Sequence, residues 1–232
     1  IIKDQEELQM GCNIAIDGPA GAGKSTIAKK VAKELSFIYV DTGAMYRAMA
    51  YYLLSQGIKG DEQEAIAEKC QGADISIEYK DGEQIVILNG ENVNGVIRTE
   101  EVGNMASVSS ANPKVREHLL KLQRTLAASN DVVMDGRDIG TTILPDAEVK
   151  IYLTASPETR AKRRALEYEQ KGIACDINQI CQDIVARDLR DMNREISPLK
   201  QAEDAVLVDS SEMGIDEVVN AILHVYRQKV QA

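Results

Sequence analysis

One stretch constrains the fold of this chain more than any other: residues 18–25 read GPAGAGKS and fit the pattern G-x-x-x-x-G-K-[S/T]. The apolar segment before it, at 13–17, has the length and composition of a buried strand, and apolar residues recur at helical spacing over 26–35. A strand, a glycine-rich loop and a helix in this order form a phosphate cradle, because backbone N–H groups and the helix N-terminus face the anion. The sequence therefore predicts a nucleoside triphosphate site.

Two side chains of this loop have predicted roles in nucleotide binding. Lys24 is placed to reach the β- and γ-phosphates, and the Ser25 hydroxyl is placed to bind the Mg²⁺ ion that accompanies ATP. The loop residues that we expect to contact ATP are Gly18, Pro19, Ala20, Gly21, Ala22, Gly23, Lys24, Ser25 and Thr26. The motif predicts a nucleoside triphosphate with Mg²⁺ and leaves the phosphoryl acceptor open.

The charge and composition of this 232-residue chain exclude several classes of protein. A net charge of −10 argues against a broad surface for nucleic acid or for anionic membranes. No apolar run approaches the roughly 18 residues of a membrane span. The four cysteines form no C-x-x-C pair, so we expect reduced thiols and no zinc site. No secretory signal is visible, and we expect a cytoplasmic protein without nucleic-acid or membrane partners.

Short apolar segments alternate with helical patterns along most of the chain, which predicts an α/β fold with a five-stranded parallel sheet flanked by helices. The expected strands are residues 13–17, 37–40, 131–134, 149–153 and 205–208. The expected helices are residues 26–35, 44–55 and 61–72, two helices within 99–129, and 215–229. Residues 74–79 alternate apolar and polar, an Asp-Gly turn follows, and we expect further strands at 84–88 and 93–98. This pattern predicts a small antiparallel β insertion.

Polar side chains follow the second and third strands where they end, and parallel sheets bind ligands at that edge. Thr42 and Arg47 are placed to hold a second phosphate, although a helix cap with a surface arginine would give the same pattern. Asp135, Arg137 and Asp138 end the third strand, and burying such charges is costly unless they meet partners or a ligand. We favour a ligand site over a structural salt bridge for this group.

The most basic part of this acidic chain lies between the fourth and fifth strands. Helical spacing predicts two arginine faces, one made by Arg160, Arg163 and Arg164, and one, on a later helix that also holds Asp191, made by Arg187, Arg190 and Arg194. Two such faces on a helical hairpin can close over phosphates, and Gly172 at the tip would let the hairpin bend. The alternative is a solvated helix surface with ion pairs along it.

Together these motifs resemble the bacterial cytidylate kinases, which belong to the nucleoside monophosphate kinases. The matching segments are GPAGAGKS at 18–25, DTGAMYR at 41–47, IRT at 97–99, NPKVR at 112–116, DGRDIGT at 135–141 and RDLRDMNR at 187–194. The resemblance extends from about residue 13 to the end of the chain. It implies a P-loop kinase fold with a core at 12–60, 101–159 and 195–232, a monophosphate-binding insertion at 61–100 and a helical lid at 160–194.

The resemblance also implies an activity, which is phosphoryl transfer from ATP to CMP or dCMP with Mg²⁺ as the cofactor. The implied CMP-binding residues are Thr42, Arg47, Ser107, Arg116, Arg137, Asp138, Arg187 and Asp191. The implied catalytic residues are Lys24, Arg137, Arg187, Asp191 and Arg194, and Arg160 and Arg164 would lie over ATP. We expect a monomeric enzyme of pyrimidine nucleotide metabolism whose partners are nucleotides.

Recognition of cytosine by three of these residues is physically reasonable. The N4 amino group of cytosine donates, so Asp138 or Ser107 can accept from it, whereas N3 and O2 accept, so Arg116 can donate to them. Uracil presents a carbonyl at position 4, and a buried Asp138 facing that carbonyl would cost about 1–3 kcal/mol. The sequence leaves the preference among CMP, dCMP and UMP open.

Three other functions are compatible with a phosphate-binding loop. A related kinase could act on UMP, AMP or a sugar acid, and a substrate panel would separate these acceptors. A regulatory GTPase would carry an N-K-x-D guanine motif, which the sequence lacks. A nucleotide sensor without turnover would need fewer charged side chains on the acceptor side than this chain has.

We expect the Lys24→Ala variant to lower turnover by ~10² or more, because it removes a positive charge from the transferring phosphoryl group. Turnover is measured with saturating ATP·Mg²⁺ and CMP, together with a circular dichroism check that the variant is folded. Near-normal turnover of the folded variant would refute the role assigned to Lys24.

Overall fold

A five-stranded parallel sheet lies at the centre of the fold in the computed structural model, which describes residues 11–230. In sheet order the strands are β2 (Ile38–Asp41), β6 (Val132–Gly136), β1 (Asn13–Asp17), β7 (Val149–Thr154) and β8 (Val206–Asp209), and each neighbouring pair is parallel. The strand that precedes the phosphate-binding loop therefore lies in the middle. The predicted parallel sheet is confirmed, and its strand bounds differ from the predicted ones by at most two residues.

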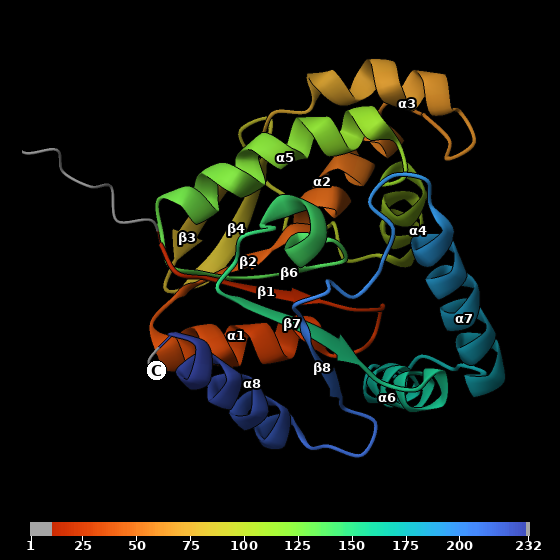
Figure 1. Cartoon of the computed structure of the whole chain (residues 1–232). Coiled ribbons are helices and arrows are strands. Elements are labelled where there is room, and N and C mark those ends of the chain that lie inside the picture. Colours follow the sequence, from red (N-terminus) through yellow and green to blue (C-terminus); the bar gives the residue numbers. More distant parts are fainter. Residues whose placement is uncertain (1–10, 231–232) are drawn as a thin grey trace, which may run out of the picture.

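Helices cover both faces of this sheet (Figure 1). On one face lie α1 (Lys24–Leu35) and α8 (Ile215–Val230), and on the other lie α2 (Thr42–Ser55) and α5 (Pro113–Ala128). The central strands are almost entirely buried, because helices on both sides leave neither face of the sheet to solvent. The start of α2 precedes the predicted residue 44, since the Asp41 carboxylate caps this helix by accepting from the Ala44 N–H at 2.9 Å.

The predicted insertion forms a short helical segment and a small antiparallel sheet. Its elements are α3 (Gln63–Lys69), the 3₁₀ turn η1 (Cys70–Gly72), β3 (Ile75–Lys80), β4 (Glu83–Leu88) and β5 (Glu91–Asn92), and α4 (Glu100–Ser109) follows. The predicted third strand at 93–98 is wrong, because β5 has only two residues and turns follow it. The Asn94 side chain explains the difference: it accepts from Val86 N at 3.0 Å and donates to Gln84 O at 2.8 Å, where a longer strand would pair.

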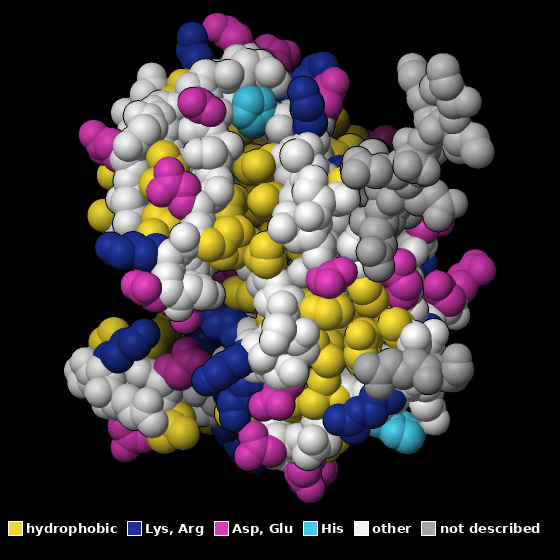
Figure 2. Space-filling view, turned by 90° about the vertical axis from the view of Figure 1, so that its left-hand side faces the viewer, with side chains coloured by type: hydrophobic (Ala, Val, Ile, Leu, Met, Phe, Trp, Pro, Cys, Tyr) yellow, Lys and Arg dark blue, Asp and Glu magenta, His cyan; other side chains and the backbone are white. Residues whose placement is uncertain are grey.

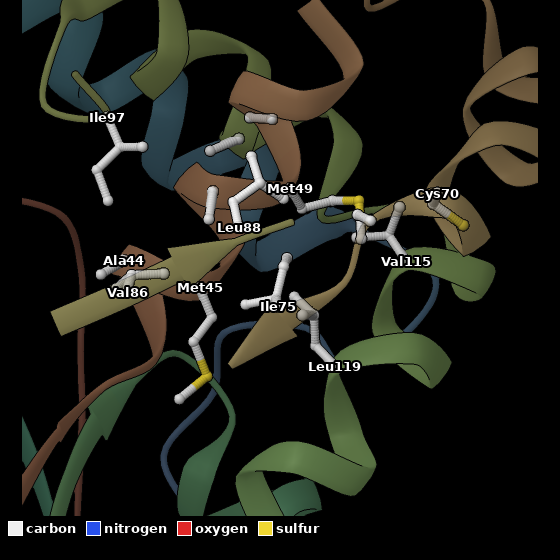
Figure 3. Close-up of a cluster of buried hydrophobic side chains, with 14 of the residues drawn as sticks. Ala44, Met45, Met49, Cys70, Ile75, Val86, Leu88, Ile97, Val115 and Leu119 are labelled. Carbon is white, nitrogen blue, oxygen red and sulfur yellow. The ribbon is translucent and has the colours of Figure 1, made fainter. Parts of the chain in front are cut away.

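The insertion shares its hydrophobic core with the main sheet. Figure 3 shows Ile75, Val86 and Leu88 of the insertion and Met45 and Met49 of α2, which all belong to one buried cluster. The same cluster includes residues of the central strands and of α5. Because one core spans both sheets, we expect the insertion and the main sheet to unfold together.

Two helices form a hairpin at one end of the molecule, where α6 (Pro157–Gln170) and α7 (Ile177–Asn193) lie side by side (Figure 1). Their contact has a small hydrophobic cluster of its own around Ala161, Ile180 and Ile184. Gly172 lies in the turn between the helices with φ +70°, a conformation that favours glycine and fits the predicted bend. The hairpin is therefore packed internally, apart from the two larger cores.

Two features of the structure, the exposure of Arg190 and a helical turn after β6, differ from what the sequence predicted. Arg190 is exposed, so the predicted arginine face of α7 is wrong at that position. After β6 the chain forms a single π-helical turn, η2 (Ile139–Ile143), which no sequence pattern predicted. Asp17 at the end of β1 stabilises this turn, because its carboxylate accepts from the Ile139 and Gly140 N–H groups at 2.7 Å each.

Within residues 11–230, no helix has both the length and the apolar character that crossing a membrane would require. All four cysteines are free thiols. Cys70 is buried in the core that the insertion shares with the sheet, whereas Cys175 is exposed between α6 and α7.

A substitution that creates a cavity at Leu88 of β4 tests whether the two sheets share one core. We expect Leu88→Ala to lower the free energy of unfolding by about 2–4 kcal/mol in a single urea transition, since it removes buried contacts on both sheets. The matched control is Ile87→Ala on the opposite, half-buried face of the same strand, for which we expect a smaller loss. Two separate transitions, or equal losses for both variants, would contradict a shared core.

Candidate active site

The phosphate-binding loop joins β1 to α1 at the carboxyl edge of the sheet, and two of its glycines are required by geometry. Gly18 passes so close to β7 that a Cβ would lie 1.9 Å from the Leu153 carbonyl oxygen, and Gly23 has φ +86°. Side chains cap the first turns of α2, α4, α5, α6 and α7, whereas Gly23 leaves the first N–H groups of α1 without a side-chain cap. These N–H groups and the positive end of the helix suit a phosphate.

Lys24 is buried at the start of α1, and its Nζ donates to the Pro19 carbonyl oxygen at 2.8 Å. Burial first, and then the positive charge of Arg137, lower the pKa of Lys24 to about 7, although Asp135 acts in the opposite direction. A buried ammonium group in this environment is stabilised by an anionic ligand. The contact of Lys24 with the phosphates of ATP stays a prediction.

Ser25 and Asp135 form a pair that fits a metal ion. Ser25 Oγ donates to Asp135 Oδ2 at 3.1 Å, which joins the first turn of α1 to the end of β6. Burial, with a further contribution from Asp41, raises the pKa of Asp135 to about 6. The described residues contain no group of three or more Asp, Glu, His or Cys side chains that could hold a metal ion. A nucleotide-bound Mg²⁺ needs no such cluster, because it commonly binds through one or two protein groups together with phosphates and water.

Arg47, Arg137 and Arg187 lie close enough for their charges to act on one another, in the region where the acceptor phosphate is predicted to bind. Arg137 Nε donates to Asp191 Oδ2 at 3.0 Å, which joins the end of β6 to α7. Arg187, one turn earlier on α7, has a buried Nε that finds no hydrogen-bond partner in the described part of the chain. Burial and the charge of Arg137 lower the pKa of Arg187 to about 10. Burial also lowers the pKa of Arg47 on α2, so this group of cations is stabilised by an added anion.

The structure brings together two of the residues that were predicted to recognise the base, Arg116 and Asp138. Asp138 is 2% exposed; its Oδ2 pairs with Arg116, and its Oδ1 lies 3.4 Å from Nη2 of Arg194. The Arg116 guanidinium lies over the Tyr46 ring, 5.6 Å from the ring centroid. The buried Ser107 hydroxyl has no hydrogen-bond partner among residues 11–230. Recognition of a base by these side chains stays a prediction.

The arginine face predicted for α6 is divided between different partners. Arg160 is 3% exposed and does not form part of a solvent-facing surface. Its guanidinium donates to the carbonyl oxygens of Ala155 at 2.9 Å and Ala20 at 3.0 Å, and to Asp188 Oδ2 at 2.6 Å. Arg160 therefore ties the phosphate-binding loop to α7, while its predicted contact with ATP stays a prediction.

The other two arginines of α6 and the Thr42 hydroxyl have separate partners. Arg163 donates to the Ser210 carbonyl oxygen at 2.6 Å, beyond the end of β8. Arg164 donates to the Tyr168 hydroxyl at 3.2 Å, and its charge contributes to the lowered pKa values of Arg47 and Arg187. Arg164 is thus the residue of this face whose charge acts on the acceptor side. The Thr42 hydroxyl donates to the Asp135 carbonyl oxygen at 2.7 Å, so it lies at the end of β6.

Sequence reasoning missed two charged residues of this region. Arg98, in the segment before α4, forms an ion pair with Asp41 at 2.8 Å, and its charge lowers the pKa of Arg47. The sequence feature that could have revealed Arg98 was its place in the IRT segment at 97–99. Asp135 was recognised as a charge that needs a partner but not as the partner of Ser25. The sequence feature that could have revealed the role of Asp135 was its position at the end of a buried strand, because ligands bind at that edge of the sheet.

Positive charge on the surface is local. Figure 2 shows Lys and Arg side chains gathered beside a hollow in one face of the molecule, while Asp and Glu side chains are spread over the same face. The whole chain has a net charge of −10. Local clusters of cations in an acidic protein suit small anions.

Known proteins match this chain over nearly its whole length. The family model described as cytidylate kinase matches residues 14–228. A cytidylate kinase from Caldicellulosiruptor saccharolyticus is 51% identical and covers 92% of this chain and 95% of its own length. Cytidylate kinases from a Geobacillus species and from Shouchella clausii are 47% and 48% identical. They cover 96% and 95% of this chain, and 100% and 98% of their own lengths, respectively.

The Arg160→Lys variant tests whether this side chain supports the loop. Lysine cannot reproduce the planar fork that serves three separate acceptors, so Ala20 loses its tie to α7. We expect the Kd for ATP to rise about five-fold, as the loss of roughly one hydrogen bond predicts, and the melting temperature to fall. Calorimetric titration measures the affinity, and Arg163→Lys is the control that should leave it unchanged. Equal ATP affinity in wild type and Arg160→Lys would contradict the supporting role.

Proposed function

The chain belongs to the cytidylate kinase family, and we propose that it transfers the γ-phosphoryl group of ATP to the phosphate of CMP or dCMP. The products are ADP and CDP or dCDP. The observation that carries the proposal is the closeness of two sites. Arg137 is the neighbour of Asp138 in the buried base-reading cluster, and its charge also lowers the pKa of Lys24 in the phosphate-binding loop. A base-reading cluster beside a triphosphate site suits a nucleoside monophosphate kinase.

The phosphate-binding loop holds ATP in this proposal. The N–H groups at the start of α1 bind phosphate oxygens, with Lys24 at the β- and γ-phosphates. Ser25 and Asp135 hold Mg²⁺, and their contact at 3.1 Å supports this assignment. When bound, Mg²⁺ offsets the negative charge of the phosphates. Lys24 then stabilises the charge that develops on the transferring group.

The acceptor phosphate is bound by arginines. Arg47 and Arg137 hold its oxygens, Arg187 approaches the transferring group, and Thr42 lies beside them. The unpaired Nε of Arg187 supports this role, because a buried donor without a partner gains from an added acceptor. The acceptor is already an anion at neutral pH, so no strong general base is needed. Catalysis consists of positioning the two phosphates and neutralising their charge.

Ser107, Arg116 and Asp138 recognise the cytosine edge. Ser107 accepts from or donates to the ring through its unpaired hydroxyl, and Arg116 donates to N3 or O2. Asp138 accepts from the N4 amino group and at the same time fixes Arg116. Asp191 holds Arg137 and reaches the ribose, and Arg194 moves from Asp138 toward the phosphates when the hairpin closes.

The hairpin of α6 and α7 acts as the lid at 160–194, and the insertion at 61–100 binds the monophosphate. The small separate core of the hairpin supports its movement as a unit. The ion pair of Arg137 with Asp191 attaches α7 to the end of β6, whereas the ion pair of Arg160 with Asp188 joins the two helices of the hairpin. Closure carries Arg164 and Arg194 over the nucleotides and excludes water, which would otherwise accept the phosphoryl group.

The proposed enzyme acts as a monomer in the cytoplasm, as part of pyrimidine nucleotide metabolism. Every side chain assigned to ATP, Mg²⁺ or CMP above comes from one chain, so no second subunit is required to complete the site. The acidic net charge supports small nucleotides as the partners, because it disfavours nucleic-acid polymers and anionic membranes.

A coupled ADP-release assay with ATP·Mg²⁺ and CMP, dCMP, UMP or AMP tests the function. We expect high kcat/KM with CMP and dCMP and low values with UMP and AMP. Asp138→Asn should lower the ratio of kcat/KM for CMP over UMP by about ten-fold or more, because its amide can donate to the uracil carbonyl. Equal turnover with CMP and UMP in the wild type would refute the recognition of cytosine by Ser107, Arg116 and Asp138. Tight ATP binding without turnover of any acceptor would indicate a nucleotide sensor instead.

A further inference from the structure

Tyr39 of β2 is a buried residue to which the proposed function assigns no role. It is 7% exposed, and its hydroxyl donates to Asp135 Oδ1 at 2.8 Å. The other oxygen of this carboxylate, Oδ2, accepts from Ser25 Oγ at 3.1 Å. Each oxygen of Asp135 is therefore held by one hydroxyl group, and only one of the two belongs to the phosphate-binding loop.

The Tyr39 side chain is itself fixed from several directions. In the parallel pairing of β2 with β6, Tyr39 lies opposite Val133, and both residues belong to the core beneath α1. Lys29 Nζ of α1 lies 5.8 Å from the centroid of the Tyr39 ring. The Tyr79 hydroxyl of the insertion donates to the Tyr39 carbonyl oxygen at 3.1 Å. The hydroxyl that meets Asp135 thus extends from a rigid strand and not from a mobile loop.

The chemistry of this contact is that of a group that orients a metal ligand. A carboxylate rotates easily about its last torsion, so a free Asp135 could turn either oxygen toward Ser25. A donor fixed on Oδ1 removes this freedom. A tyrosine hydroxyl is neutral, so, unlike a lysine or an arginine, it leaves the negative charge of the carboxylate available to a cation. Partners of this kind typically change metal affinity by about 10–100-fold.

We propose that Tyr39 is a positioning residue of the metal site, whose hydroxyl fixes the Asp135 carboxylate so that Oδ2 faces Ser25 and the nucleotide-bound Mg²⁺. The inference rests on the proposed function, in which Ser25 and Asp135 hold that ion. It assigns to Tyr39 no contact with either nucleotide. Its effect is therefore confined to metal binding, which separates it from a purely structural role.

Binding of Mn²⁺ to the complex of the enzyme with ADP tests the inference without turnover. Electron paramagnetic resonance measures the Kd of Mn²⁺, and titration with ADP in EDTA measures nucleotide affinity without metal. We expect Tyr39→Phe to raise the Kd of Mn²⁺ about ten-fold and to leave the Kd of metal-free ADP unchanged. Tyr39→His, which keeps a ring N–H donor, should give an intermediate Kd of Mn²⁺ and provides a second test should the phenylalanine variant fold poorly.

Two further variants separate the possible outcomes. Tyr79→Phe removes a hydroxyl that contacts the backbone of Tyr39 and not Asp135, so it should bind Mn²⁺ as the wild type does. Asp135→Asn should weaken Mn²⁺ binding at least as much as Tyr39→Phe, and no effect there would refute the proposed metal site itself. A wild-type Kd of Mn²⁺ in Tyr39→Phe, with weakened binding in Asp135→Asn, would overturn the role of Tyr39 alone. Equal losses of Mn²⁺ and metal-free ADP binding in Tyr39→Phe would also overturn it, because they indicate a structural role.

Discussion

Buried positive charge that the chain does not fully neutralise is the constraint on which the rest of this site depends. The charge of Arg137 lowers the pKa of both Lys24 and Arg187. Arg137 follows β6, Lys24 begins α1 and Arg187 lies on α7, so Arg137 is close enough to repel the other two cations. The nearby carboxylates already have partners, since Asp191 holds Arg137 and Asp138 holds Arg116. In the proposed function, the phosphate groups of the two substrates supply the missing negative charge. We therefore expect substrate binding to neutralise the buried positive charge, and the proposed function uses the same cations for phosphoryl transfer.

Contacts through β2 hold the insertion, which lies on the acceptor side, in a fixed position relative to the phosphate-binding loop. Gln84 of the insertion accepts from the Asp41 N–H at 2.8 Å and donates to the Asp41 carbonyl at 3.2 Å. An ion pair at 2.7 Å between Lys29 of α1 and Glu83 of β4 adds a second, exposed contact. A shared core and buried hydrogen bonds resist opening more than ion pairs do. The hairpin of α6 and α7 has a small core of its own, so we expect movement to be concentrated there.

Local patterns in the sequence were sufficient for most elements of the fold and for much of the site. The buried strands, the Asp-Gly hairpin and the helix that carries Arg116 depend on neighbours along the chain, and they lie where the pattern predicted them. The strand expected at 93–98 does not form, because the Asn94 side chain takes the pairing positions of β4. Arg190 shares the spacing of an arginine face and still lies in solvent, since spacing alone does not show which side of a helix is covered.

The sequence by itself determined the phosphate-binding loop, the alternation of strands and helices, and the types of charged residue at the strand ends. These features depend on glycine conformation, apolar period and chain order, which are local properties. Only the tertiary structure decided that Asp135 lies between Ser25 and Tyr39, and that Arg160 supports the loop from α6. Such contacts join β6 to α1 and β2, and α6 to the phosphate-binding loop, and the partners in each contact are far apart in sequence. No local pattern records the order in which a sheet places its strands, and that order sets which side chains meet.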